Sequence, residues 1–196
     1  METFNIAELE ESYTDRAVVN ESNKKDTVYK GNYNVTIKKV TLQVSSDESQ
    51  TPGRKVVNLQ VAIAKGADKV VTQFVRVSPD VFRKFSVGGE TTLIGETSPE
   101  YDKTLPLDSQ SKLWGHIESI MNPKGTMTKA EVVKSLPEAT FQAYILEGFA
   151  DDKGGMAFPD GDPAKDLKSY EASRNTLMQA GMISKNFFSS FRAVKG

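Results

Sequence analysis

Aromatic and basic side chains lie close together at two places in the sequence. Phe82-Arg83-Lys84-Phe85 puts two aromatic rings around two cations, and Phe74 and Arg76 are two residues apart in a segment with strand-like alternation. Cations can neutralise phosphates while nucleobases stack on aromatic rings, which is how proteins hold single-stranded nucleic acids. These residue types therefore indicate a surface that could bind an unpaired oligonucleotide.

Both clusters also have a purely structural interpretation. Residues 82–85, which we expect in a loop, could instead form a short amphipathic helix that buries both phenylalanine rings. Strand alternation places Phe74 and Arg76 on the face opposite the valines of the same segment, as a base platform beside a phosphate contact. An added helix over that face would instead make Phe74 an ordinary core residue.

Further candidates for nucleic-acid contacts are four cations and one tyrosine. Lys38 and Lys39 lie near the middle of a long predicted strand, and Arg54 and Lys55 follow a turn-rich segment, so all four could contact the phosphate backbone. Tyr101 is a further stacking candidate. The alternative for the lysines is that they are simply solvated surface residues.

The sequence offers little for catalysis or metal binding. It has no cysteine and one histidine, His116, so thiolate sites and histidine clusters are excluded. Five aspartates at positions 151, 152, 160, 162 and 166 could attract a hard cation, but their spacing does not fit an EF-hand, and turn and capping roles explain them. The common nucleotide, nucleophile and zinc motifs are also absent. We expect neither an enzyme nor a cofactor, although paired glycosidase carboxylates cannot be recognised from sequence.

The strand pattern that must position these residues begins with a change of parity. Between Tyr33 and Val44 the apolar residues first occupy odd positions and then, from Val40, even positions. Because strand side chains alternate between faces, the change predicts a bulge in a long, bent strand over 29–44. Two further strands follow, over 54–64 and 69–77, joined by a turn at 65–68. A bent first strand in an antiparallel meander is typical of a five-stranded OB-fold barrel.

Helices are predicted after an irregular segment that follows the third strand. Asp108 or Ser109 can cap a helix that extends to Met121, with Trp114 packed in the interior, and Thr128-Lys129-Ala130-Glu131 matches a capping box for a second short helix. Strands over 140–149 and 156–158 flank a turn at 151–155, and a helix over 163–180 precedes a phenylalanine-rich tail. We thus expect a mainly β protein with added helices: a barrel with its helix between strands three and four, and a helical C-terminal segment.

Charge divides the chain into distinct parts. Residues 1–26 carry seven acidic and three basic residues, whereas residues 30–77 carry eight basic and three acidic ones. The local excess of +5 matters more for binding a polyanion than the total charge of −1. We expect an acidic mobile arm over 1–27, an OB-fold-like barrel over 28–160, and a C-terminal helix with its tail over 161–196.

The order of these elements resembles that of phage-encoded OB-fold single-stranded-DNA-binding proteins. The resemblance lies in residues 31–40 (GNYNVTIKKV), residues 54–63 (RKVVNLQVAI), the interstrand helix around Leu113-Trp114 and the hairpin that closes the barrel. It implies DNA replication or recombination in a bacteriophage as the setting. Many such proteins end in an acidic tail, whereas this chain ends in a basic segment and has its acidic segment at the N-terminus.

We therefore expect a protein that coats single-stranded DNA with little sequence preference. The alternative is a virion structural or self-assembling interaction protein, and a carbohydrate-binding or hydrolytic domain is a third interpretation. Expected partners are single-stranded DNA and, through the acidic arm, replication or recombination proteins; homo-oligomerisation stays open. Without a signal peptide or an apolar span, the expected location is the cytoplasm, that of the host if the protein is viral.

Overall fold

The computed structural model describes residues 27–65 and 69–194. Their secondary structure consists of β1 (Gly31–Val44), β2 (Lys55–Lys65), β3 (Lys69–Val77), β4 (Phe82–Val87), β5 (Glu90–Gly95), α2 (Ser109–Met121), α3 (Lys129–Lys134), β6 (Thr140–Ala150), β7 (Met156–Ala157), α4 (Leu167–Gln179) and β8 (Ile183–Arg192). The expected arm over 1–27 lies outside the described residues except for Thr27, as do residues 66–68 of the expected turn.

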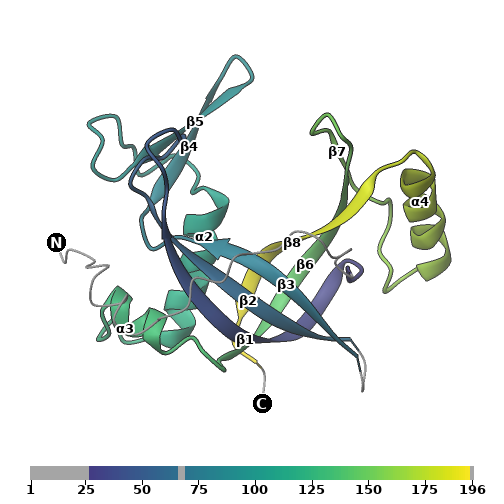
Figure 1. Ribbon diagram of the computed structural model, residues 1–196, viewed down its shortest axis with the longest axis horizontal. Coiled ribbons are helices and arrows are strands. Elements are labelled where there is room, and N and C mark those ends of the chain that lie inside the picture. The colour runs from purple at the N-terminus through teal and green to yellow at the C-terminus, as the bar shows by residue number, and fades with distance from the viewer. Residues whose placement is uncertain (1–26, 66–68, 195–196) are drawn as a thin grey trace. The chain divides into compact units, whose positions relative to one another are not determined.

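The fold is mainly β, with antiparallel strand pairs and three helices in the described residues (Figure 1). The larger sheet has the order β3-β2-β1-β6-β7, and β8 also pairs with β6, whereas β4 and β5 form a separate two-stranded sheet. Helices α2 and α3 therefore stand between the third and fourth strands of the larger sheet along the chain, as predicted. None of the described helices combines the length and the apolar character that a membrane span needs.

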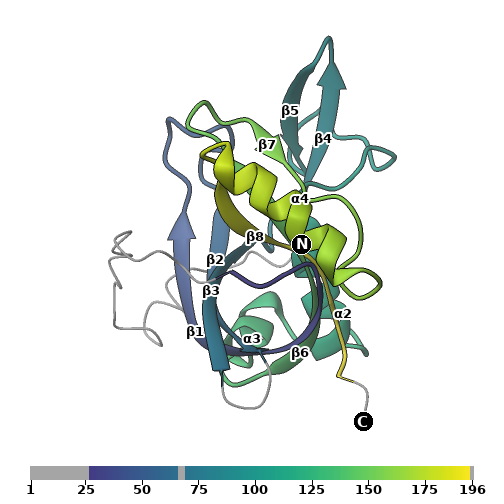
Figure 2. The same cartoon turned by 90° about the vertical axis from the view of Figure 1, so that its right-hand side faces the viewer.

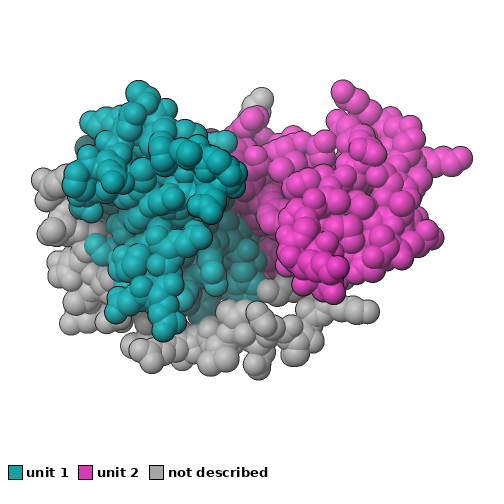
Figure 3. Space-filling view, turned by 90° about the horizontal axis from the view of Figure 1, so that it is seen from above, with its two compact units in different colours: residues 1–20, 37–61, 74–139 teal, residues 21–36, 62–73, 140–196 magenta. Residues whose placement is uncertain are grey.

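The chain divides into two compact units, coloured separately in Figure 3. Unit 1 comprises residues 1–20, 37–61 and 74–139, and unit 2 comprises residues 21–36, 62–73 and 140–196. Strands β1, β2 and β3 each contribute residues to both units. The three predicted domains do not follow this division.

The predicted change of parity in β1 appears in the burial of its side chains. Val35 and Ile37 are buried at odd positions, whereas Val40 is buried at an even one. The strand nevertheless continues unbroken from Gly31 to Val44. Beyond Val40 the alternation weakens, because Val44 is 45% exposed. The sequence pattern therefore located the change of the buried side correctly.

In unit 1, the core is formed by one face of β2 and by the apolar sides of α2 and α3. Its buried residues include Val57, Leu59, Val61, Leu113, Ile117, Val132, Val133 and Leu136. Asp108 is the N-cap of α2, accepting hydrogen bonds from the backbone N–H groups of Gln110 and Ser111, and Thr128 forms the predicted capping box with Glu131. Both caps satisfy N–H groups that a helix end leaves without a partner, and both helices begin where the sequence predicted.

The segment after β3 differs from the prediction of an irregular excursion. Residues 82–95 form a hairpin, β4 and β5, in which Phe82 pairs with Gly95 and Val87 with Glu90. Gly88 and Gly89 adopt positive φ angles of 60° and 87°, as the two-residue turn between such strands requires. Within unit 1, the hairpin points away from α2 and α3 in both ribbon views (Figures 1 and 2).

In unit 2, β6 is the central strand. Residues 31–36 of β1 pair with one edge of β6, and β7 and β8 also pair with β6. β6 and β7 flank a turn at 151–155, as predicted. The C-terminal segment contains the predicted helix α4, but the phenylalanine-rich tail, for which we predicted no element, forms strand β8. Phe191 of this strand is buried against Phe141, with ring centroids 5.6 Å apart.

A buried carboxylate links β6 to the elements around it in unit 2. Glu147 of β6 has a fully buried side chain that forms an ion pair with Arg174 of α4, with 2.7 Å between carboxylate oxygen and Nε. The hydroxyls of Tyr170 and Ser184 donate hydrogen bonds to the same carboxylate at 3.1 and 2.7 Å. Burial, together with the charge of Glu147, raises the pKa of Tyr170 to about 12. The network satisfies a charge that would otherwise be costly to bury.

Candidate nucleic-acid interface

Every residue that the sequence predicted for nucleic-acid contacts lies in unit 1. On β3, Phe74 and Arg76 are exposed, whereas Val75 and Val77 on the opposite face are 5% and 0% exposed. Phe74 retains 44% exposure, so the alternative that it is an ordinary core residue is wrong. An aromatic ring and a guanidinium therefore share one accessible strand face, which is the arrangement that stacking and phosphate binding require.

The Phe82–Phe85 cluster is neither a loop nor a helix, because it forms most of strand β4. Alternation puts Arg83 and Phe85 on one face and Phe82 and Lys84 on the other. Phe85 is 45% exposed and Phe82 is half-buried, so the alternative in which both rings are buried is also wrong. The hairpin therefore presents Phe85 to solvent, with exposed Lys84 beside it in sequence.

Tyr101 lies beside the hairpin through a contact with Arg83. The Nε of Arg83 donates a hydrogen bond to the Tyr101 hydroxyl at 2.9 Å, and the guanidinium carbon lies 5.5 Å from the centre of the tyrosine ring. The Arg83 Nη1 also donates to the carbonyl oxygen of Leu105. Arg83 thus uses some of its hydrogen-bond donors within the protein. Its contact with Tyr101 holds that ring next to strand β4.

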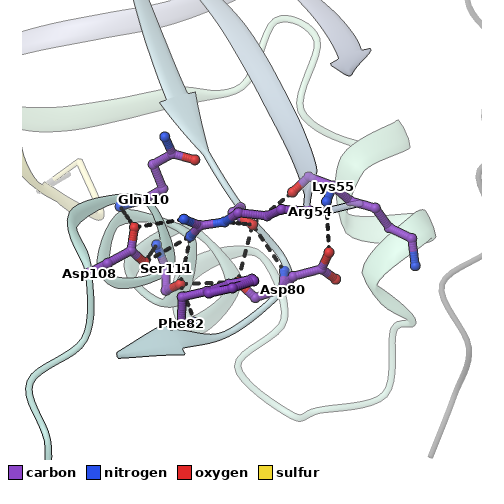
Figure 4. A network of polar contacts seen from close by, with 8 residues as sticks. Arg54, Lys55, Asp80, Phe82, Asp108, Gln110 and Ser111 are labelled. Atoms are coloured by element: carbon purple, nitrogen blue, oxygen red, sulfur yellow. Dashed lines mark hydrogen bonds and ion pairs between the residues drawn. The ribbon is translucent and has the colours of Figure 1, made fainter. Parts of the chain in front are cut away.

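Arg54 is a correction to the predicted set of phosphate contacts. It is only 3% exposed, and its Nη1 and Nη2 form two hydrogen bonds with the Asp108 carboxylate at 2.9 and 2.8 Å. Nε and Nη2 also donate to the hydroxyls of Ser78 and Ser111 at 2.9 and 3.0 Å (Figure 4). A guanidinium with these donors committed inside the protein is not available to phosphate at the surface.

The Arg54 network fixes the base of the β4–β5 hairpin. The Phe82 ring lies against the guanidinium, with 4.4 Å between the Arg54 Cζ and the ring centre, and the Phe82 backbone N–H donates to the Ser111 hydroxyl at 2.9 Å (Figure 4). Burial by itself raises the pKa of Asp108, but hydrogen bonds from Arg54 and Ser111 outweigh burial and hold the pKa below its usual value. Asp108 is therefore charged at neutral pH and joins the N-terminus of α2 to the hairpin.

The predicted lysines lie in different surroundings. Lys38 forms an ion pair with Glu138 at 2.8 Å, in which both side chains are largely exposed, and Lys39 is half-buried on β1. The backbone N–H of Lys55 donates to the Asp80 carboxylate at 2.7 Å, while its side chain extends away from the Arg54 network (Figure 4). An exposed ion pair costs little to exchange for a phosphate contact, so Lys38 stays a candidate.

The remaining polar candidates have structural roles. Trp114 is 2% exposed and its Nε1–H donates to Glu118 at 3.1 Å, which confirms the prediction of packing. Asp166 is the N-cap of α4, and Asp151 accepts hydrogen bonds within the turn after β6. Across the described ranges, no three His, Cys, Asp or Glu side chains are grouped so that they could hold a metal ion.

Sequence reasoning missed the exposed rings of unit 2. Phe158 and Phe187 are 54% and 38% exposed. The signal that could have found Phe187 is the alternation within residues 183–192, which the phenylalanine-rich composition of the tail obscured. Both rings belong to unit 2, whereas the predicted set belongs to unit 1.

Comparison with known proteins adds no relative. No protein family, curated protein or solved structure matches the chain. The function must therefore be argued from the exposed rings and cations of the two units themselves.

Proposed function

We propose that the protein binds single-stranded DNA with little sequence preference, in replication or recombination of the bacteriophage type. The observation that carries the proposal is the pairing of Phe74 and Arg76 on the accessible face of β3. A base can stack on the ring of Phe74 while Arg76 contacts a neighbouring phosphate, and neither contact reads the identity of the base.

The charge of the strand region supports this proposal even after the correction at Arg54. Without that buried residue, residues 30–77 carry seven basic and three acidic side chains, a net charge of +4. On the hairpin, Phe85 adds a second exposed ring, which shares its strand face with Arg83, and the exposed Lys84 lies on the opposite face. Local positive potential of this kind attracts a polyanion although the whole chain has a net charge of −1.

The proposal includes a closed OB-fold-like barrel made of β1, β2, β3, β6 and β8. The antiparallel order and the position of the helices between β3 and β6 support it. Closure requires β3 to pair with β8.

Amide hydrogen exchange tests this pairing, because the β3 amides that point away from β2 are protected only if another strand accepts their hydrogen bonds. Rapid exchange at these amides would contradict a closed barrel.

The binding test is a titration of fluorescent oligothymidine and of a duplex of equal length at two salt concentrations. We expect preference for the single strand and a decrease of affinity with salt, with a slope of about 0.7 per neutralised phosphate. Unchanged anisotropy at low salt would refute the proposal. Concentration-dependent assembly without any binding of the oligonucleotide would favour the alternative of a self-assembling structural protein.

Two test variants and one control locate the binding surface in unit 1. Phe74→Leu retains apolar bulk but removes the ring, so it should cost up to about 1–3 kcal/mol of binding free energy. Arg76→Gln should reduce the salt slope by about 0.7. The matched control is Lys112→Gln, which removes an exposed cation on α2 and should leave the slope unchanged. Equal effects of Arg76→Gln and Lys112→Gln would mean that β3 is not the binding face.

The acidic segment 1–26 lies outside the described residues, and its proposed role rests on charge alone. Its seven acidic residues could compete with DNA for the cations of residues 30–77, and could also recruit replication or recombination proteins. Deletion of residues 1–26 should then tighten oligothymidine binding. An unchanged or weaker affinity would contradict the competition.

A further inference from the structure

Three large apolar side chains gather over a glycine in the middle of the unit 2 sheet. A Cβ atom added to Gly148 of β6 would lie 2.9 Å from the Phe158 ring, 3.1 Å from the Met156 methyl group and 3.1 Å from the Phe187 ring. Carbon atoms cannot approach so closely without displacement. The absence of a side chain at position 148 therefore allows the three groups, here called the Gly148 cluster, to meet on the sheet surface.

The Gly148 cluster remains open to solvent although its members contact one another. Met156, Phe158 and Phe187 are 44%, 54% and 38% exposed. The two rings have centroids 6.3 Å apart and planes inclined by 59°, so they do not stack flat on each other and each can offer a face to a ligand. Core residues of the same strand, such as Phe149, are fully buried. The cluster thus forms an aromatic patch on the outer side of the sheet.

The exposed side chain of Lys185 places a cation next to the aromatic patch. In the pairing of β6 with β8, Lys185 lies directly opposite Gly148, and paired residues of antiparallel strands project from the same face. Lys185 is exposed. The nearby turn carries Asp151 and Asp152, but Asp151 is engaged by the backbone N–H groups of Lys153 and Gly155. A phosphate could therefore approach the patch from the side of Lys185.

We propose that the Gly148 cluster is a second stacking site for nucleobases, with Lys185 as its phosphate contact. The inference rests on the proposed binding of single-stranded DNA and extends it to unit 2. The chemistry matches what an unpaired strand requires, namely aromatic faces beside a cation.

A tryptophan reporter tests this site directly. In Phe158→Trp, a base stacked on the cluster should quench the new fluorescence during titration with unlabelled oligothymidine, measured as the difference from the wild-type protein, whose single Trp114 is buried. The matched control is Leu167→Trp, which places the reporter at an exposed position of α4. We expect quenching of Trp fluorescence in the first variant and little change in the second.

The outcomes separate this inference from the proposed function. If labelled oligothymidine binds but the Phe158→Trp reporter is not quenched, or both reporters are quenched equally, the second site is refuted while DNA binding stands. If the oligonucleotide does not bind at all, both proposals fail. Phe187→Leu provides an independent measurement, since loss of one stacked ring should weaken binding about 5-fold or more. Unchanged affinity of a folded Phe187→Leu protein would overturn the assignment.

Discussion

Replacement of Asp108 by asparagine should destabilise unit 1 strongly. The substitution keeps the size of the side chain but removes the charge that two guanidinium nitrogens of Arg54 contact at 2.8 and 2.9 Å. Arg54 is 3% exposed and cannot turn to solvent, and removal of one partner from a buried ion pair costs about 3–5 kcal/mol. Asparagine can still cap α2, so we expect no additional cost from the helix end. For a chain of this size, the melting temperature should decrease by about 6–20 °C.

Urea unfolding followed by tryptophan fluorescence measures this effect in the right place. The single tryptophan, Trp114, is buried on α2, the helix that Asp108 caps. The control is Lys38→Met, which breaks an ion pair whose partners are 48% and 69% exposed and should change the free energy of unfolding by at most about 1 kcal/mol. Equal, small effects of both variants would refute the view that the buried pair stabilises the hairpin base.

The same residue predicts a dependence of stability on pH. The pKa of Asp108 in the folded protein lies below its unfolded value of about 3.9, so its contribution is fully present above that pH and is lost as the pH falls through the folded pKa. Wild-type unit 1 should therefore lose stability in acid. The Asp108→Asn variant should lose less over the same range, and an identical acid dependence of both proteins would contradict the assignment.

Three further predictions concern the buried network of unit 2 and a helix cap. Arg174→Met leaves the Glu147 carboxylate buried without its ion pair, so it should cost about 3–5 kcal/mol in urea unfolding followed by circular dichroism, and a loss below 1 kcal/mol would contradict the role of the pair. Burial raises the pKa of Tyr170 to about 12, so the contribution of the neutral Tyr170 hydroxyl to stability is present below pH 10 and is lost as the pH rises. In an ultraviolet titration of tyrosine ionisation, Tyr170→Phe should remove the last phenolate step. Thr128→Ala should lower stability by about 0.5–2 kcal/mol through loss of the capping box, and a neutral result would show that α3 is held by packing alone.

Local signals in the sequence carried most of the correct predictions. Asp108 and Thr128 were recognisable as helix caps because a cap depends on a few consecutive residues, and its chemistry is the same in any fold. The parity change between Ile37 and Val40 is also local, since it reflects only which side of β1 is buried. Phe74 was placed on the correct face by alternation, although the sequence could not decide whether another element covered it.

Partners far apart in the chain were the source of the errors. From the sequence, Arg54 resembled a surface cation. Its partner is the carboxylate of Asp108, which lies 54 residues further along the chain, and no spacing rule links the two residues. The hairpin of β4 and β5 was missed because no regular apolar alternation marks it: Phe82 and Phe85 are three residues apart, a spacing that fits a helix as well as a strand. β8 was missed because its aromatic side chains divide between a buried position, Phe191, and an exposed one, Phe187.

The exposed phenylalanines argue for binding more strongly than the charges do. Phe74, Phe85, Phe158 and Phe187 lie in or beside strands and are 38–54% exposed. Burial of such a ring contributes roughly 1.5–3 kcal/mol, so each partly exposed ring leaves part of that stabilisation unrealised. A nucleobase stacked on the ring would remove the same surface from water. Surface cations are common in proteins that bind no nucleic acid. By contrast, exposed rings beside cations on two sheets are not required by the fold. The rings are therefore the features on which the proposed function depends.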